Sequence, residues 1–245
     1  MPMKEISLFF FKVANKFYTH LFSLYNPLYF FYKKLSDKQI IEWLSGQIKP
    51  GMNVVDVGGN IGFYTILFSR LAGVHGKVNV FEPDTVNFNH LKQNTKGLRN
   101  VSINHCAIAE RSGMIRLFRS EELNVDHQTY DMGENRTSIE VPCVTLDDYF
   151  HQNERIDFIK IDIQGYEYHA LLGMRETIKR SRPIVIFSEF WPYGLRKAGV
   201  DPNEYLALLR ELGFELKYWP SPKRIDDRER FDDKNFYTNI YGIRK

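Results

Sequence analysis

The stretch Val54-Val55-Asp56-Val57-Gly58-Gly59-Asn60-Ile61-Gly62-Phe63-Tyr64-Thr65 decides the fold of this chain. An apolar run reaches an acidic residue, a glycine-rich turn follows, and a helical pattern begins at once. This order is typical of a buried parallel strand that turns sharply into a helix. The stretch therefore predicts an α/β sheet with a nucleoside-binding turn at the carboxyl end of a strand.

The glycine turn has the chemistry for a nucleoside ligand without phosphate. Gly58 and Gly62 lack a Cβ where a ligand and the next helix must approach the backbone, and the amides from Asn60 onward lie at a helix N-terminus. Asp56 is expected to face the same space, where the ligand approaches the turn. The turn has neither the Gly-x-Gly-x-x-Gly of dinucleotide folds nor a Gly-Lys-Ser/Thr for phosphates. A cationic adenosine ligand fits it better.

The next predicted strand supplies an acidic residue at a suitable distance. Val78 to Phe81 ends at Glu82, about 20 positions beyond the glycines, where this architecture hydrogen-bonds the ribose hydroxyls. Farther along, Cys106 and Ala107 are expected to lie against the adenine ring. The alternative is a βαβ unit whose glycines serve only close packing.

Four motifs follow one another along the chain: residues 56–65, Phe81-Glu82-Pro83, residues 141–148 and residues 159–167. Together, over roughly Met52 to Phe190, they resemble the FkbM family of S-adenosylmethionine-dependent methyltransferases. The resemblance implies a Rossmann-like class I methyltransferase fold and S-adenosyl-L-methionine as cofactor. Many family members carry Glu where this chain has Gln164, so an acid role is not carried over to that position.

Two carboxylates are predicted at the edge of the sheet where open α/β sheets bind ligands. Asp162 ends the predicted strand 156–163, and Glu189 lies near the end of the predicted strand 183–190. A hydroxyl acceptor must lose its proton during methyl transfer, so a carboxylate base is expected, with Asp162 the first candidate and Glu189 the second. Either could instead orient the acceptor or hold the methionyl ammonium of the donor. The alternative is that Asp162 only caps the helix that follows it. Glu167, inside that predicted helix, is expected to support the site and not to act as the base.

The predicted reaction is methylation of a hydroxyl oxygen on a sugar, a glycan or a natural product, as the resemblance implies. Methylation of nitrogen or a carboxyl group, and a non-catalytic donor-binding module at a membrane surface, are the alternatives. No metal is expected, because no compact Asp/Glu/His spacing demands one. The net charge of +3 is too small to indicate a nucleic-acid partner.

The chain is predicted to form one methyltransferase domain, residues 36–245, after a helical extension, residues 1–35. The sheet is expected to have seven strands, mostly parallel, with an antiparallel C-terminal pair at Phe214–Trp219 and Asn239–Arg244. One helix is predicted over 166–179.

The extension is rich in aromatic residues and basic. Apolar residues from Ile6 to Leu21 recur at helical spacing, and Asn26-Pro27 is predicted to end this helix and start a short second one. Ser36 to Gln39 matches a capping box for the next helix. The extension either packs on the domain or on a second subunit of a homodimer and shapes the acceptor pocket, or lies on a membrane surface.

Residues 112–144 are expected to leave the sheet as a β excursion with a polar tip. The tip is either an acceptor-binding lid containing Asp126, His127 and Arg136 or a solvated loop. No signal sequence is visible, and the two cysteines have no disulfide or metal spacing. The expected location is therefore the cytoplasm, with the inner face of the membrane as the alternative.

Overall fold

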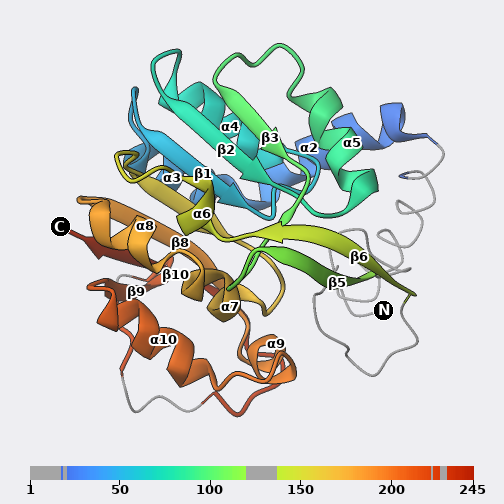
Figure 1. Ribbon diagram of the computed structural model, residues 1–245. Coiled ribbons are helices and arrows are strands. Elements are labelled where there is room, and N and C mark those ends of the chain that lie inside the picture. Colours follow the sequence, from blue (N-terminus) through green and yellow to red (C-terminus); the bar gives the residue numbers. More distant parts are fainter. Residues whose placement is uncertain (1–17, 19–20, 120–136, 222, 227–230) are drawn as a thin grey trace.

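A seven-stranded sheet forms the centre of the molecule (Figure 1). The computed structural model describes residues 18, 21–119, 137–221, 223–226 and 231–245. The strand order is β3-β2-β1-β7-β8-β10-β9, and β10 is antiparallel to both of its neighbours. The predicted class I methyltransferase architecture is thereby confirmed. Along the chain, the strands of this sheet are β1 (Asn53–Val57), β2 (Lys77–Phe81), β3 (Val101–Asn104), β7 (Phe158–Ile161), β8 (Ile184–Phe190), β9 (Glu215–Trp219) and β10 (Thr238–Arg244).

The parallel strands end at one edge. Val57, the last residue of β1, pairs with Phe81 of β2 on one side and with Ile161 of β7 on the other. The loops that follow these three strands therefore start at the same level. This register brings the glycine turn, Glu82 and Asp162 to one place.

Apolar cores on both faces of the sheet hold the helices in position. One core joins Leu44 and Phe68 to strand residues such as Val54, and the other joins Leu171 and Leu206 to the opposite face. Burial of these side chains is the main stabilising contribution. The first face carries α3 (Lys38–Gln47) and α4 (Phe63–Ala72), with α5 (Thr85–Asn94) beyond β2; the second carries α6 (Leu146–Tyr149), α7 (Glu167–Leu172), α8 (Arg175–Arg180), α9 (Pro192–Lys197) and α10 (Pro202–Glu211).

The predicted β excursion forms a small second sheet. Its order is β4-β6-β5, with β4 at Ala107–Ile108, β5 at Gly113–Arg119 and β6 at Thr137–Val144. The predicted lid residues Asp126, His127 and Arg136 lie outside the described residues.

The helix predicted over 166–179 is wrong, because two helices, α7 and α8, occupy this segment. The carbonyl of Gly173 accepts a hydrogen bond from the Asp147 N–H instead of from a helical amide. The Asp147 carboxylate then accepts from the amides of Glu176 and Thr177, at 3.1 and 2.7 Å, and so caps a new helix. A residue distant in sequence divides the helix.

The predicted break at Asn26-Pro27 is also wrong. One helix, α2, runs from Phe22 to Ser36 with Pro27 inside it. Asn26 does not cap a helix, since its side chain exchanges hydrogen bonds of 2.7 and 3.2 Å with Asn94 of α5. Contacts with the domain on both sides of Pro27 outweigh the lost backbone hydrogen bond. The earlier helix predicted from Ile6 falls largely outside the described residues.

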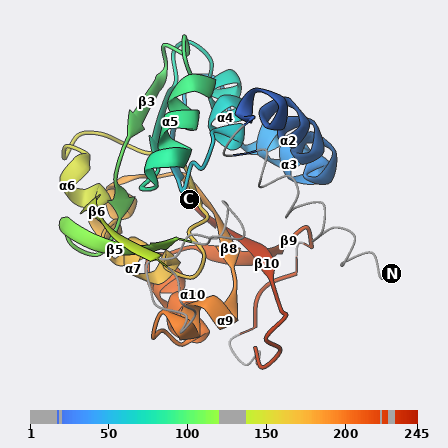
Figure 2. The ribbon, with the colours of Figure 1, turned by 90° about the vertical axis from the view of Figure 1, so that its right-hand side faces the viewer.

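The capping box predicted at Ser36 does not form. Ser36 belongs to the last turn of α2, and Asp37 makes no side-chain cap to α3. The Asp37 carboxylate instead accepts from the Tyr64 hydroxyl at 2.6 Å and forms an ion pair with Lys33. These contacts join α2 to the helix that follows the glycine turn, and Figure 2 shows α2 and α3 beside α4.

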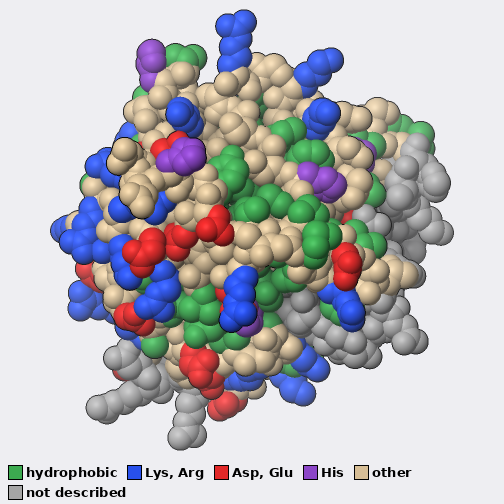
Figure 3. Space-filling model, viewed as in Figure 1, with side chains coloured by type: hydrophobic (Ala, Val, Ile, Leu, Met, Phe, Trp, Pro, Cys, Tyr) green, Lys and Arg blue, Asp and Glu red, His purple; other side chains and the backbone are tan. Residues whose placement is uncertain are grey.

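The described helices and the face drawn in Figure 3 bear on contacts with membranes and nucleic acids. None of the described helices is both long and apolar enough to cross a bilayer. On the face shown in Figure 3, the Lys and Arg side chains of the described residues are mixed with Asp and Glu.

Candidate cofactor and acceptor site

A cavity of about 650 Å³ lies at the carboxyl ends of β1, β2, β7 and β8. This is within the usual size range of small-molecule sites. Of the residues predicted for the site, six line the cavity: Gly58, Asn60, Glu82, Ala107, Asp162 and Glu189. The topology therefore brings together residues that span more than half of the chain.

Gly58 allows the turn after β1 to lie directly against the chain after β7. Its φ is +82°, and a Cβ built on it would lie 2.1 Å from the carbonyl oxygen of Asp162. No side chain fits there, so glycine is required at this position. Asn60 also has a positive φ, of 49°, which places its N–H toward Glu82.

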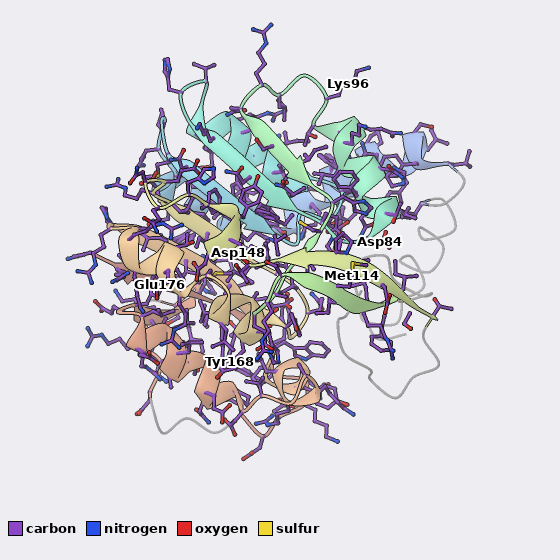
Figure 4. The ribbon with its side chains drawn as sticks, in the orientation of Figure 1. Asp84, Lys96, Met114, Asp148, Tyr168 and Glu176 are labelled. Atoms are coloured by element: carbon purple, nitrogen blue, oxygen red, sulfur yellow. The ribbon has the colours of Figure 1, made fainter. Side chains whose placement is uncertain are left out.

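Glu82 is held by main-chain donors. Its Oε2 accepts from the N–H of Asn60 at 2.8 Å and its Oε1 from the N–H of Asp84 at 2.9 Å. Asp84 in turn caps α5, at whose start it lies in Figure 4. Burial raises the pKa of Glu82 to about 7. The Asn87 side chain also hydrogen-bonds to this carboxylate. Acceptor capacity remains for a ligand hydroxyl, because a carboxylate accepts about four hydrogen bonds in all.

Asp56 and Gly62, predicted to bind the cofactor, do not line the cavity. Asp56 is fully buried behind it and accepts from the Thr65 hydroxyl at 2.7 Å. Gly62 has a φ of +93°, and a Cβ there would lie 2.9 Å from Leu91 of α5. Both residues shape the turn from behind.

Cys106 and Ala107 differ in their placement. Ala107 and its neighbour Ile108 line the cavity with small and apolar side chains. Cys106 packs against the main core instead, and burial raises the pKa of its thiol to about 11. Both cysteines are free thiols.

Lys160 lines the cavity, although its role was not predicted from the sequence. It is buried in β7, with Nζ 3.2 Å from Asp162 Oδ2, 3.7 Å from Asp56 Oδ1 and 5.1 Å from the centroid of the Tyr64 ring. Burial alone would lower its pKa, but the two carboxylates raise it above the ordinary value, so Lys160 is cationic. A charged residue in the apolar run Ile159-Lys160-Ile161 was the available signal, because buried charges are almost always paired.

Asp162 and Glu189 are joined by Gln164. The Gln164 Nε2 lies 3.3 Å from Asp162 Oδ1 and 3.0 Å from Glu189 Oε1, and the backbone φ of Gln164 is +56°. The side chain of Asp162 is 38% exposed, whereas Glu189 is only 2% exposed. The two predicted carboxylates thus lie side by side in different environments.

Glu189 places a buried carboxylate oxygen at the site. Its Oε2 has no hydrogen-bond partner among the described residues. Burial, together with the charges of Asp162 and Glu167, raises the pKa of Glu189 well above its ordinary value. The charge of Glu189 in turn raises the pKa of the Tyr237 hydroxyl, which also hydrogen-bonds to this carboxylate. A buried carboxylate with a raised pKa at a cavity is a candidate proton acceptor.

Glu167 lies behind the site and holds the loop that carries Gln164. Its Oε1 accepts from the amides of Ile163 and Gly165, at 3.2 and 3.1 Å. Burial raises its pKa to about 7. The N-terminus of α7 has no side-chain cap, so Asp162 does not serve as one.

Aromatic side chains cover the rest of the wall. They come from segments far apart in the chain, and α2 contributes two of them, so the extension helps to form the cavity. The aromatic residues are Tyr29, Tyr32, Phe63, Tyr64, Phe81, Tyr166, Trp191 and Tyr237. Among the described residues, no group of three or more His, Cys, Asp or Glu side chains is arranged to hold a metal ion.

Solved structures share this fold. A SAM-dependent O-methyltransferase from Thermotoga maritima is 16% identical with a TM-score of 0.51; the alignment covers 84% of this chain and 64% of that protein, so this chain spans less than two thirds of its length. Aeropyrum pernix fibrillarin with bound S-adenosyl-L-methionine is 13% identical (TM-score 0.50; 84% and 74% covered). An O-methyltransferase from Bacillus cereus in complex with SAH is 15% identical (TM-score 0.50; 86% and 81% covered).

The sequence comparisons add the family. Comparison with curated proteins found no match. The family model described as the methyltransferase FkbM domain matches residues 56–216, more than half of the chain. This range contains the glycine turn, Glu82, Lys160, Asp162 and Glu189. The chain therefore belongs to the FkbM methyltransferase family, and S-adenosylmethionine is its cofactor.

Proposed function

We propose that this protein transfers a methyl group from S-adenosylmethionine to a hydroxyl oxygen of a sugar, a glycan or a related natural product. The observation that carries the proposal is the buried carboxylate of Glu189 at the cavity, beside Asp162 and Gln164 and next to the Tyr237 hydroxyl. A neutral hydroxyl needs a proton acceptor during methyl transfer, and a carboxylate of raised pKa is a better base than an ordinary one.

The donor side of the cavity fits S-adenosylmethionine. Glu82 has the acceptor capacity for ribose hydroxyls, and Ala107 and Ile108 give a small apolar surface for adenine. The absence of a Cβ at Gly58 lets the turn lie against the chain after β7, and Gly58 and Asn60 of this turn line the cavity. Asp162 is the carboxylate available to the methionyl ammonium. The cofactor supplies an electrophilic methyl group, and these side chains hold and orient it.

Glu189 is the better candidate for the base, which reverses the order predicted from the sequence. Asp162 lies 3.2 Å from the cationic Lys160, so its carboxylate is already engaged in an ion pair. Glu189 is buried next to other carboxylates, which strengthens its affinity for a proton. We therefore assign proton removal to Glu189 and donor or acceptor positioning to Asp162.

The acceptor side supports a ring-shaped, hydroxyl-bearing acceptor. Trp191, two residues beyond Glu189, and Tyr237, whose hydroxyl lies close to the Glu189 carboxylate, contribute flat aromatic surfaces to this side. Such surfaces bury the apolar faces of sugar rings, while the carboxylates and Gln164 bind hydroxyls. Two of the similar structures are described as O-methyltransferases. At 15–16% identity, this similarity shows a shared fold and not a shared substrate.

Two measurements test the proposal in sequence. Calorimetric titration with S-adenosylhomocysteine should show micromolar binding to the wild type, and Glu82→Ala should abolish it. Acceptor screening with ¹³C-methyl-labelled S-adenosylmethionine should then give a methyl ether, recognised by its carbon chemical shift. A methylated amine or a methyl ester would overturn the assignment to a hydroxyl oxygen.

A further inference from the structure

Helix α2 is apolar on two opposite sides. Its inner side packs on the domain, where Phe22 stacks on His90 and Phe30 contacts Phe63 edge to face. Its outer side exposes five large apolar side chains, from 45 to 69% of each, and we call this set the α2 stripe. The stripe consists of Leu21, Leu24, Leu28, Phe31 and Leu35.

The α2 stripe is a concentrated feature of the described surface. Ten large apolar side chains are exposed among the described residues, and five of them belong to the stripe. Their spacing of three and four residues places them on one face of the helix. A helix that is apolar on every side is normally buried, and a contiguous exposed apolar patch marks an interaction site. The stripe therefore calls for a partner.

The charges beside the stripe indicate the chemistry of this partner. The helix from Phe22 to Ser36 contains no Asp or Glu. Lys34 is exposed near its C-terminal end. The side chain of Lys38, just beyond that end, is 74% exposed and lies 3.9 Å from Glu42. Large apolar residues next to lysines are typical of helices that lie in the interface of an anionic bilayer.

A second copy of the chain fits the stripe less well. A helix of this length is roughly 22 Å long, and a strip about 10 Å wide on it covers roughly 220 Å². A stable protein interface needs about 800 Å² on each partner. The stripe also spans only two heptads, whereas a coiled coil needs about three or four. The stripe alone is too small to hold a dimer.

The stripe adjoins the cavity. Tyr32, 49% exposed, lies next to Phe31 at the edge of the stripe and also lines the cavity, as do Tyr29 and Lys33 from the inner side of α2. We propose that the α2 stripe docks the protein on an anionic membrane surface and so places the cavity at that surface. An amphiphilic acceptor would then reach the cavity from the interface. The docking itself does not depend on the reaction.

Vesicle flotation of the full chain tests this proposal. The probes are vesicles of phosphatidylcholine alone and of phosphatidylcholine with 30 mol% phosphatidylglycerol. The wild type is compared with Leu28→Gln/Phe31→Gln, two stripe residues that do not line the cavity. The matched control is Val74→Gln/Met114→Gln, which removes two other exposed apolar side chains, 88 and 61% exposed, of which Met114 lies on β5 (Figure 4). Binding of S-adenosylhomocysteine verifies that each variant is folded.

The proposal predicts that the wild type floats with the anionic vesicles, less with neutral ones, and less at high salt. The stripe variant should lose at least tenfold in vesicle partitioning, while the control variant keeps it. Equal flotation of the wild type and the stripe variant would overturn the proposal. So would a wild-type dimer in light scattering that the stripe variant converts to a monomer without any vesicle binding, because the stripe would then serve a second copy.

Discussion

The two sides of the cavity are built in different ways. On the donor side, the backbone sets the geometry, because Gly58 lies against the carbonyl of Asp162 and main-chain amides hold Glu82. On the acceptor side, side chains from distant segments form the wall, among them Tyr29 and Trp191. The donor side should therefore tolerate almost no change, whereas substitutions on the acceptor side should alter the choice of substrate.

The largest effect should come from adding one methyl group to the donor side. In Gly58→Ala, the new Cβ meets the Asp162 carbonyl, and we expect a loss of more than about 3 kcal/mol in unfolding free energy or of more than about 100-fold in S-adenosylhomocysteine affinity. Denaturant unfolding and calorimetry measure the two quantities.

Gly97→Ala is the matched control for this substitution. Gly97 has a similar φ of +87°, but nothing lies within 4 Å of the added Cβ. It should cost only the backbone strain, about 1 kcal/mol, and leave cofactor binding unchanged. Equal behaviour of the two variants would contradict a sterically fixed donor turn.

The second-largest effect should distinguish the residue that removes the proton from the residue that positions the cofactor. Glu189→Gln should lower kcat by about 10²–10⁴-fold, the usual contribution of a general base, with little change in S-adenosylhomocysteine affinity. Asp162→Asn should lower kcat less and weaken cofactor binding more. Steady-state kinetics with an identified acceptor and calorimetry distinguish the two. If the double variant kept most of its activity, no base would be needed, and methylation of nitrogen or a carboxyl group would be favoured.

The third effect is a pH dependence on the donor side. The pKa of Glu82 is raised to about 7, so the group is protonated below this pH and loses its negative charge and part of its acceptor capacity. S-adenosylhomocysteine affinity should therefore fall by about tenfold from pH 8 to pH 6, the change expected for one required carboxylate. Calorimetry across this range measures it. In Glu82→Gln the dependence should disappear, and a persistent slope would assign it to another group.

The smallest effect should appear on the acceptor side. Trp191→Leu removes a flat surface from the wall, and the neighbours of this ring are Tyr193 and Gly194 of α9. We expect the KM for a ring-shaped acceptor to rise about three- to tenfold, with unchanged cofactor affinity. Kinetics with two acceptors of different size would sharpen the result, because a wall residue should affect them unequally.

The donor side was largely predictable from the sequence because its signals are local. Gly58 and Glu82 belong to consecutive strand-helix units, and their spacing follows from the length of one such unit. Asp56 and Gly62 share the same motif, but whether a side chain faces the cavity or the core depends on packing. Lys160 could have been predicted as a site residue, because it is a charged residue within an apolar strand.

The acceptor side was not predictable in the same way. Tyr29, Trp191 and Tyr237 have no mutual spacing in the chain, and only the folded sheet brings them together. Pro27 shows the same limit, because its local preference for ending a helix is overridden by contacts with the domain. Asp147 likewise divides a helix that periodicity alone predicts to be continuous.

The position of α2 has a consequence for engineering. The helix precedes the first strand, and polar contacts join it and the turn after it to the rest of the protein, among them Asn26 with Asn94 and Asp37 with Tyr64. A graft of this helix from another family member, with Asn26 and Asp37 retained, would replace part of the cavity wall and leave the glycine turn untouched. New acceptor ranges can thus be sought by exchanging a single short cassette.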